Sequence, residues 1–411
     1  MRRSLCRFCG SPLEQVFADL GVSPLANSYV TPERRLEMEP FFPLRAYVCS
    51  QCFLVQLEEH GGTPDSIFSD YAYFSSYSTS WLEHSRAYAR SALARFGLGA
   101  ESKVVELASN DGYLLQYFVE AGIPVLGVEP AANVAEVAVA SGVPTAIRFF
   151  GRASALELRG PHSADLLIGN NVLAHVPDLN DFVAGLKLLL KPRGVITMEF
   201  PHLMRLIEDV QFDTIYHEHF SYFSFSTAQR VFAGHGLELF DVEELPTHGG
   251  SLRIYARHEE DHSRPVAESV RELGRREADA GYNELAPYAA FAERVKREKW
   301  EMLSFLIEQK RSGSSIAGYG APAKGNTLLN YCGIGTDIVD YTVDRNPRKQ
   351  GTYLPGSRIP ILDPSEIERT RPDLLFILPW NLRDEVIEQM AVIRDWGGRF
   401  VVRSPRLRVF A

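Results

Sequence analysis

From Lys103 onward, short apolar runs alternate with amphipathic stretches. Four runs share a β-branched, apolar composition and end in small or polar residues: 103–109, 124–130, 164–170 and 194–200. Strands that alternate with helical patterns are typical of a doubly wound parallel sheet. Two later runs, LELFDVEEL and SLRIYARH, are neighbours in the chain and suit an antiparallel end to that sheet. We therefore expect a Rossmann-like α/β domain over residues 66–260, with a bridging helical segment at 66–100.

A second alternating pattern begins at Ser314. Its strand-like runs are SSIAGYG, IVDYTVD, DLLFILPW and RFVVRS, and they predict a second, smaller Rossmann-like α/β domain over residues 313–411. Residues 261–312 are charge-rich and helical in pattern, and we interpret them as a helical connector. Residues 1–65 are rich in proline and turn signals and are expected to form a separate N-terminal module.

Length and composition indicate a globular protein of two or three domains. The chain has 411 residues, 45% of them apolar and 23% charged, as is ordinary for such proteins. A net charge of -9 disfavours a general affinity for nucleic acid or anionic membranes. No apolar run approaches the ~20 residues of a membrane helix, and MRRSLCRFCG lacks the apolar core of a secretory signal. We expect a cytoplasmic location, and the sequence does not set the oligomeric state.

Four of the five cysteines form two close pairs: Cys6 with Cys9, and Cys49 with Cys52. Two thiolates separated by two residues can chelate one ion, and two such pairs complete a tetrahedral Zn²⁺ site. Free thiols are the alternative, and disulfides are disfavoured in a cytoplasmic chain. Four sulfur ligands leave no open coordination position, so the sequence predicts a structural zinc ion. Cys332 stands alone and is interpreted as a small buried apolar residue.

The turn after the first predicted strand of the central domain carries acids. Glu106 lies within the strand, and Asn110, Asp111 and Gly112 follow it. A dinucleotide-binding turn uses three glycines to approach a pyrophosphate, whereas this turn has one glycine and carboxylates that would repel phosphate. A cationic nucleoside without phosphates suits the turn, and S-adenosylmethionine (SAM) has this character.

Two later strand ends support the same interpretation. Glu129 ends the second strand, where its carboxylate can accept both hydroxyls of a ribose. Asn170 and Asn171 end the next predicted strand, where the methionine end of SAM would reach. These residues together favour a nucleoside site. The alternative is a structural strand–helix turn with incidental acids.

The segment TIYHEHFSYFS, residues 214–224, concentrates titratable and hydroxyl-bearing side chains. Metal ligation by His217 and His219 is disfavoured, because zinc-binding histidine pairs on helices are spaced i, i+4 rather than i, i+2. His217 is interpreted as a satisfied structural histidine. The HGGS turn offers His248 and Ser251, which either line a cleft or simply form a glycine turn.

GYGAPAKGNTLLN follows a predicted strand and opens a predicted helix. Gly320 and its neighbouring glycines expose backbone N–H groups at a helix N-terminus, and Lys324 adds a cation, which suits a diphosphate. Further candidates for contacts to a nucleotide lie downstream: Asp344, Arg345, Arg348 and Lys349. The alternative for this downstream stretch is a solvated charged loop.

Eight motifs occur along the chain in one order: CRFCG, CSQC, DYAYFSSYSTSW, ELASNDGYLLQ, NNVLAHVPDLNDF, YHEHFSYFS, HGGSLR and GYGAPAKGN. In this order they resemble the SAM-dependent sugar C-methyltransferases that act on nucleotide-linked 4-keto-6-deoxy sugars, and the resemblance spans the whole chain. It implies a four-cysteine zinc module, a central class I methyltransferase domain and a C-terminal domain that helps to hold the nucleotide sugar. The implied substrate is a deoxythymidine diphosphate (dTDP) sugar or a similar one, methylated at C3.

The resemblance also implies residue roles. His219 matches the base that removes the proton next to the ketone, and a histidine suits that task because its usual pKa of ~6.5 is near working pH. Glu218 is expected to orient or polarise this base, and Tyr216 to hydrogen-bond the sugar or its enolate. His175 matches another residue of the sugar site, with a structural role as an equal alternative. The last matched positions lie in the bridging segment: Tyr71, with Tyr73 and Tyr77 as alternates.

Two other functions stay open on the sequence alone. One is an NAD-dependent nucleotide-sugar oxidoreductase that uses the GYGAPAKG turn with Asp344 as the ribose-binding acid, although that turn lacks the third glycine at the usual position. The other is a non-catalytic zinc-ribbon protein that binds nucleic acid or another protein. The acidic net charge and the few basic residues around the cysteines disfavour nucleic acid.

Overall fold

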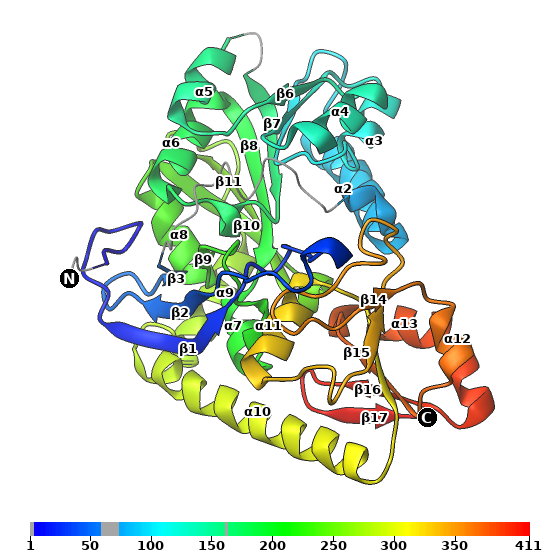
Figure 1. The fold of residues 1–411 in the computed structure, drawn as a ribbon. Coiled ribbons are helices and arrows are strands. Elements are labelled where there is room, and N and C mark those ends of the chain that lie inside the picture. The colour runs from blue at the N-terminus through cyan, green and yellow to red at the C-terminus, as the bar shows by residue number, and fades with distance from the viewer. Residues whose placement is uncertain (1–3, 59–73, 161–162) are drawn as a thin grey trace.

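The computed structural model describes residues 4–58, 74–160 and 163–411. These residues form a four-stranded, a seven-stranded and a six-stranded sheet. In Figure 1 the seven-stranded sheet of the central domain lies above and the six-stranded sheet of the C-terminal domain lies below, with the N-terminal strands beside their boundary. Each of the three sheets is built mainly from one part of the chain: N-terminal, central or C-terminal.

The central sheet has the strand order β10-β11-β8-β7-β4-β5-β6. Strands β4 to β8 are parallel, and β11 runs antiparallel to both β8 and β10. The strands are β4 (Val104–Leu107), β5 (Val125–Glu129), β6 (Thr145–Ile147), β7 (Ala164–Asn170), β8 (Leu190–Pro201), β10 (Leu237–Leu245) and β11 (Ser251–His258). All four predicted strands and the antiparallel end are confirmed, and this Rossmann-like order is that of a class I methyltransferase.

Strand order reverses between β4 and β7, because the chain continues from β4 to β5 on one side and returns to β7 on the other. In open α/β sheets ligands bind beyond the carboxyl ends of the strands at such a point. The helices of this domain are α2 (Thr79–Phe96), α3 (Leu115–Glu120), α4 (Ala132–Ala140), α5 (Arg152–Leu158), α6 (Leu179–Leu189), α7 (Leu203–Glu208) and α8 (Phe225–Ala233).

Within the bridging segment, Thr79–Phe96 form helix α2. The hydroxyl oxygen of Ser78 accepts a hydrogen bond from the backbone N–H of Trp81 at 3.3 Å and caps the start of the helix. Gly97 ends the helix in the left-handed conformation with φ of 61°, which glycine adopts without a steric cost.

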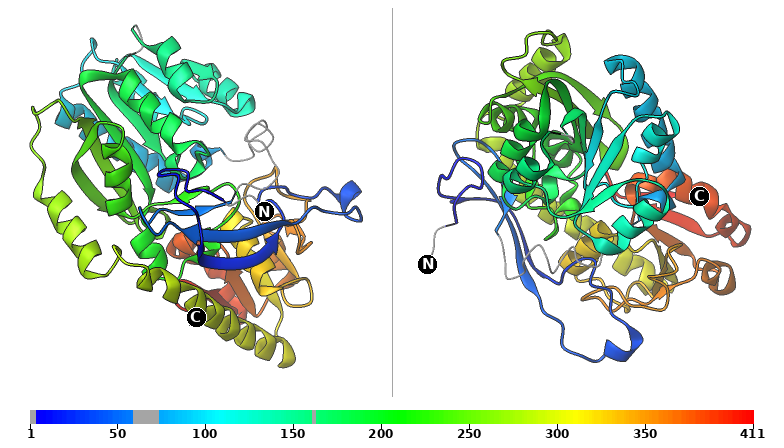
Figure 2. Two further views of the ribbon diagram at one scale, coloured as in Figure 1. Left: turned by 90° about the vertical axis from the view of Figure 1, so that its left-hand side faces the viewer. Right: turned by 90° about the horizontal axis from the view of Figure 1, so that it is seen from above.

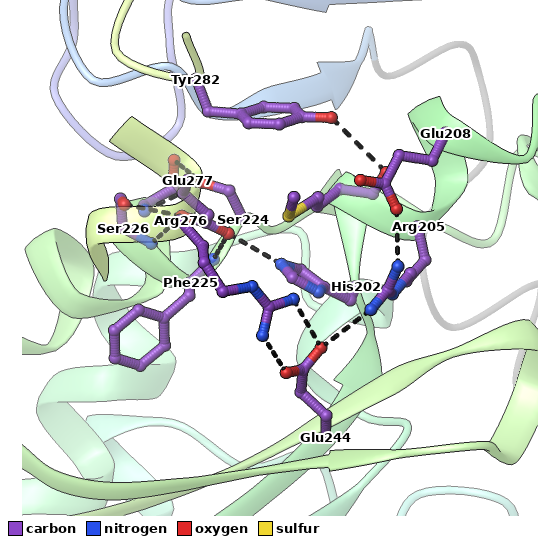
Figure 3. Close-up of polar contacts among 12 residues, drawn as sticks. His202, Arg205, Glu208, Ser224, Phe225, Ser226, Glu244, Arg276, Glu277 and Tyr282 are labelled. Atoms are coloured by element: carbon purple, nitrogen blue, oxygen red, sulfur yellow. Dashed lines mark hydrogen bonds and ion pairs between the residues drawn. The ribbon is translucent and has the colours of Figure 1, made fainter. Parts of the chain in front are cut away.

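The predicted connector consists of helices α9 (Glu268–Asp279) and α10 (Ala286–Arg311). Helix α9 packs on α8 and β10, and its fully buried Glu277 accepts hydrogen bonds from His202 and from the start of α8 (Figure 3). Helix α10 packs on the N-terminal strands, where Phe291 stacks on Phe17 with ring centroids 4.4 Å apart. Both helices thus complete hydrophobic cores in addition to joining two domains.

The C-terminal sheet has the order β14-β13-β12-β15-β16-β17, parallel except for β17. Its strands are β12 (Ile316–Tyr319), β13 (Tyr341–Val343), β14 (Ile361–Leu362), β15 (Leu374–Ile377), β16 (Arg399–Val402) and β17 (Arg408–Phe410). Its helices are α11 (Ala323–Cys332), α12 (Glu366–Thr370) and α13 (Arg383–Gln389). The second Rossmann-like domain is confirmed, and Cys332 is buried as expected.

The N-terminal sheet is completed by a strand from the central domain. It has the order β1-β2-β3-β9, with β1 (Gln15–Ser23), β2 (Phe42–Val48), β3 (Val55–Leu57) and β9 (Ser221–Tyr222). Strand β9 belongs to the TIYHEHFSYFS segment, which therefore links the N-terminal module to the methyltransferase sheet. Figure 2 shows the N-terminal strands reaching along the side of the molecule. Within the described residues, no helix combines the length and apolar character needed to cross a bilayer.

Candidate active site

One cleft of about 950 Å³ is lined by residues from the central domain, the C-terminal domain and the N-terminal module. It contains most of the residues predicted from the sequence: Tyr77, Asn110, Glu129, Asn170, Asn171, His175, Tyr216, Glu218, His219, His248, Gly320, Lys324, Asp344 and Lys349. Positions far apart in the chain therefore meet in one place. Tyr71 and Tyr73 lie outside the described residues.

His219 is held in one orientation by the segment around it. Its Nδ1 lies 3.0 Å from the carbonyl oxygen of Thr214, which can only accept, so Nδ1 carries the proton. Its Nε2 lies 2.7 Å from the hydroxyl of Tyr216 and is left with the lone pair. Burial and the neighbouring His175 lower the pKa of His219 well below its usual value. The imidazole is thus neutral, with a basic nitrogen in the cleft.

Glu218 does not orient His219, contrary to the expectation from sequence. The backbone carbonyl of Thr214 and the hydroxyl of Tyr216 take both ring nitrogens of His219. The carboxylate of Glu218 instead accepts a hydrogen bond at 2.7 Å from the side-chain amide of Asn27 in the N-terminal module. Burial raises the pKa of Glu218 to about 7, and the bond from Asn27 opposes that rise.

His175 lies against the TIYHEHFSYFS segment. Its ring centroid is 4.7 Å from that of His219, and the two rings are almost perpendicular. The carbonyl of Ala174 accepts a hydrogen bond at 2.7 Å from the backbone N–H of Phe220, which ties the two segments together. Burial lowers the pKa of His175 to about 4, so this imidazole is also neutral.

The residues at the carboxyl ends of β5 and β7 form a pocket that fits a nucleoside. The two carboxylate oxygens of Glu129 accept hydrogen bonds from the backbone N–H groups of Asn110 (3.0 Å) and Ala131 (2.9 Å), which fixes the carboxylate in the cleft. Oδ1 of Asn171 is buried without a hydrogen-bond partner in the described structure, and the side chain of Asn170 is buried beside the hydroxyl of Tyr113. A buried unpaired amide oxygen indicates a polar ligand, and the amino-acid end of SAM supplies a matching donor.

Four predicted residues of the central domain do not line the cleft. Glu106 is fully buried within β4, where burial raises its pKa well above the usual value. Asp111 accepts hydrogen bonds from the backbone N–H and hydroxyl of Ser76, so it holds the turn that precedes α2. Gly112 has a φ of 80°, and a Cβ there would lie 3.0 Å from a methyl carbon of Val143, away from the cleft.

The fourth of these residues is Ser251. Its hydroxyl donates to the carbonyl of Thr247 at 2.9 Å and faces a separate shallow hollow. Its predicted role in substrate binding is therefore not supported by its position. The nearby His248 does line the cleft, where its Nε2 lies 3.1 Å from the amide nitrogen of Asn171.

The other end of the cleft is formed by the glycine-containing turn of the C-terminal domain. Gly320 has a φ of 87°, and a Cβ there would lie 2.6 Å from a ring carbon of Pro379, so only glycine fits. The ammonium of Lys324 donates to Oδ1 of Asn381 at 2.7 Å and lies 4.5 Å from the Trp380 ring centroid. Burial lowers the pKa of Lys324 to about 8.

Asp344 and Lys349 complete this end of the cleft. The carboxylate of Asp344 accepts hydrogen bonds from the backbone N–H groups of Ala321 and Asn346, both at 2.8 Å. The ammonium of Lys349 lies 3.6 Å from that carboxylate and donates to the carbonyl of Ala321 at 2.9 Å. The two lysines give this end a basic character that the β4 turn lacks.

The four predicted zinc ligands gather at one point of the N-terminal module. The sulfur atoms of Cys6, Cys9, Cys49 and Cys52 all lie within 4.8 Å of one another, and none is in a disulfide. Zn–S bonds of about 2.3 Å place tetrahedral sulfurs about 3.8 Å apart. The Cys6–Cys52 and Cys9–Cys49 sulfur distances are both 3.5 Å. The cysteine cluster therefore fits a zinc ion.

Sequence reasoning missed several residues of the cleft. Asn27 and Tyr29 reach it from the N-terminal module, and Trp81, His84 and Asn381 also line it. His84 is held 2.9 Å from the buried carboxylate of Glu199. Trp81 ends the motif DYAYFSSYSTSW, which could have pointed to it. No spacing or motif singles out the other four, because each joins the cleft only through contacts between distant parts of the chain.

Solved structures of methyltransferases resemble part of this chain. The magnesium protoporphyrin IX methyltransferase (ChlM) from Synechocystis PCC 6803 with bound SAH is 14% identical, with a TM-score of 0.35 over 43% of this chain and 82% of that chain. The CcbJ methyltransferase from Streptomyces caelestis is 14% identical, with a TM-score of 0.34 over 42% of this chain and 89% of that chain. Likenesses of this size do not bear on function.

Family models match the chain along most of its length. Residues 6–68 match a zinc binding domain, residues 81–242 a methyltransferase domain, and residues 246–405 the C-methyltransferase C-terminal domain. The C-methyltransferase NovU from Streptomyces niveus is 37% identical over 408 residues, which cover 99% of this chain and 96% of that protein. This decides against the oxidoreductase and the non-catalytic zinc-ribbon alternatives. The chain belongs to the SAM-dependent C-methyltransferases, with SAM as its methyl donor and zinc in its N-terminal module.

Proposed function

We propose that this enzyme methylates C3 of a nucleotide-linked 4-keto-6-deoxy sugar, with dTDP as the nucleotide. The observation that carries the proposal is the state of His219, a neutral imidazole whose unprotonated Nε2 faces a cleft with two unlike ends. Methyl transfer to carbon requires a carbon nucleophile, and a C–H bond next to a ketone supplies one when a base removes the proton. Nε2 of His219 is placed to act as that base.

In the proposed reaction the C3–H bond breaks, and its proton moves to Nε2 of His219. The bonding electrons form a double bond between C3 and C4, and the ketone oxygen takes the negative charge. When bound, SAM supplies an electrophilic methyl group, so that a C3–CH₃ bond forms as the S–CH₃ bond breaks and its electron pair stays on sulfur. The chain's own task is thus to remove one proton and to stabilise one oxygen anion.

Hydrogen-bond donors beside His219 support the second part of that task. The hydroxyl of Tyr216 is 2.7 Å from Nε2 and can turn to donate to the enolate oxygen once a sugar lies between them. Preorganised donors of this kind contribute most where charge develops in a water-poor site. Tyr216 is itself within the TIYHEHFSYFS segment, so the proposed base and donor lie three residues apart in one segment.

The two unlike ends of the cleft support a nucleotide-linked substrate. The end near Glu129 and Asn170 suits a nucleoside without phosphates, which is the character of SAM. The end near Lys324 and Lys349 offers two cations and a turn at the start of α11, which suits a diphosphate. A sugar joined to a nucleotide by a diphosphate can therefore bind in the C-terminal domain and present its ring to His219.

The proposal is tested by incubating the purified enzyme with SAM and a panel of dTDP- and GDP-linked 4-keto-6-deoxy sugars, followed by mass spectrometry. We expect one methyl group to be added to a dTDP sugar, and fragmentation to place it on the ring carbon next to the ketone. Methylation only of an oxygen or nitrogen of the sugar, or only of compounds without a nucleotide, would contradict it.

A further inference from the structure

The N-terminal module contributes side chains to the catalytic cleft. Asn27 and Tyr29 lie in the loop between β1 and the 3-10 helix Pro32–Arg34, and both line the cleft. The amide nitrogen of Asn27 donates to Oε1 of Glu218 at 2.7 Å, across a separation of 191 residues. Glu218 is only 4% exposed, so a donor from another part of the chain holds a carboxylate that is almost shielded from water.

Tyr29 extends the same contact to the C-terminal domain. Its hydroxyl donates to the carbonyl of Ala321 at 2.7 Å and lies 3.4 Å from Oδ1 of Asn27. Ala321 belongs to the glycine-containing turn, where its backbone N–H donates to Asp344. A continuous series of polar contacts thus runs from the carboxylate beside the base, through the N-terminal module, to the turn proposed to hold a diphosphate.

The N-terminal module also fixes the far end of the TIYHEHFSYFS segment. Strand β3 pairs with β9, so that Val55 lies opposite Tyr222. The backbone N–H of Leu57 donates to the carbonyl of Phe220 at 3.0 Å. Since Glu218 and His219 lie just before these paired residues, the module holds their backbone and, through Asn27, the side chain of Glu218.

We infer that Asn27 is a positioning residue of the active site, which holds the Glu218 carboxylate in place and favours its ionised form. The inference rests on the proposed function for its link to turnover. It assigns the zinc module a role beyond stability, because the loop that carries Asn27 is part of the module that the cysteine cluster holds together.

The charges around Glu218 make its protonation a sensitive readout. The ring of His175 contacts the backbone of Glu218, and His219 follows it in the chain with its ring turned toward Thr214 and Tyr216. Tyr29 is near it from the N-terminal module, and Lys349 and Asp344 lie beyond Tyr29 in the C-terminal domain. Burial raises the pKa of Glu218 to about 7, and the Asn27 donor lowers it. Removing the donor therefore moves the pKa of Glu218 further up.

The first test compares rate against pH for the wild type and Asn27→Ala, with saturating SAM and nucleotide sugar. A hydrogen bond to a charged group shifts a pKa by roughly one to two units. We expect the acidic pKa of the kcat–pH profile to rise by that amount in Asn27→Ala, which lowers kcat at pH 7 roughly tenfold. The KM for the sugar should change less than about twofold. Asn27→Gln, which keeps a donor, should restore part of the rate. Ser28→Ala, at an exposed neighbour, should leave the profile unchanged.

The second test needs no substrate, so it separates this inference from the proposed function. Glu218 binds its proton more tightly in the folded than in the unfolded chain, so its contribution to stability falls as pH rises from its ordinary value of ~4.3 to about 7. Glu218→Gln removes this fall. We expect the melting temperature of wild type to drop relative to Glu218→Gln up to about pH 7, and that of Asn27→Ala to keep dropping to a higher pH.

Each outcome decides the inference. An Asn27→Ala variant whose melting temperature follows the wild type at every pH overturns the contact with Glu218. A shifted melting profile with an unmoved kcat profile overturns the role in turnover. If no keto sugar in the panel is methylated, the proposed function fails, while the melting profile still decides whether Asn27 controls Glu218.

Discussion

Each of the two Rossmann-like domains has a carboxylate after its second strand that accepts backbone N–H hydrogen bonds. The charged side chains around the two carboxylates are opposite in sign. In the central domain, Glu129 ends β5 and accepts a hydrogen bond from the backbone N–H of Asn110 in the first turn. In the C-terminal domain, Asp344 follows β13 and accepts one from Ala321 in the equivalent turn. Each carboxylate also accepts a second backbone N–H just downstream in its own loop.

The charged residues near the two carboxylates, Glu129 and Asp344, differ. Asp111 lies near Glu129 and contributes to raising its pKa, after burial. Lys349 lies 3.6 Å from Asp344, and Lys324 lines the cleft from the start of α11. The same backbone arrangement therefore serves SAM in the central domain and, in our proposal, a diphosphate in the C-terminal domain. Fold sets the place of the ligand, and the flanking charges set its kind.

The largest expected effect comes from removing the Glu129 carboxylate of the central domain. Glu129→Ala should weaken SAM binding about 100-fold or more, because a carboxylate that holds two ribose hydroxyls loses two charge-assisted hydrogen bonds. Equilibrium dialysis with tritiated SAM measures this, and dTDP binding should stay within about twofold. An equal loss of dTDP affinity would show that the two ends of the cleft are not separate sites.

A smaller effect is expected at the basic end. Lys324→Met should raise the dissociation constant for a dTDP sugar about 10- to 100-fold, the value of one or two hydrogen bonds to a charged group. SAM affinity should not change. Titration calorimetry with dTDP and with SAM checks both, and unaltered dTDP binding would remove Lys324 from the proposed diphosphate site.

The sequence predicted the sheets better than the contacts. Strands β4, β5, β7 and β8 were predicted because central parallel strands are continuous apolar runs. Strand β6 was missed because it has three residues, all at least partly exposed at the sheet edge. Gly112 was assigned to the cofactor because a glycine with positive φ looks the same in sequence whether it faces a ligand or, as here, packs against Val143.

The contacts of Glu218 show what sequence could not supply. The order of residues in YHEH suggested that neighbouring Glu218 and His219 act together. The backbone instead turns so that His219 faces Thr214 and Tyr216, and Glu218 faces Asn27. That partner is 191 residues away and carries no motif of its own. The pairing of β3 with β9, together with the contact of His217 with the carbonyl of Pro43, brings the two segments together.

The smallest expected effect is a pH dependence of the affinity for a dTDP sugar, with no matching dependence for SAM. Burial lowers the pKa of Lys324 to about 8. The side chain therefore carries a positive charge below that pH and loses this charge above it. The affinity for a dTDP sugar should therefore fall above pH 8 by up to about tenfold per unit. SAM affinity should stay flat over the same range, and Lys324→Met should abolish the dependence on pH. An equal slope for both ligands would contradict the assignment.

The central claim is that His219 removes a proton from carbon, and hydrogen exchange tests it without methyl transfer. In deuterated buffer without SAM, the wild type should add one deuterium to the ring carbon next to the ketone of a dTDP-4-keto-6-deoxy sugar, detected by mass spectrometry. His219→Asn should lose this exchange. The matched control His217→Asn changes a histidine of the same segment whose Nε2 contacts the carbonyl of Pro43, and it should retain exchange. Exchange at the wild-type rate in His219→Asn would contradict the account.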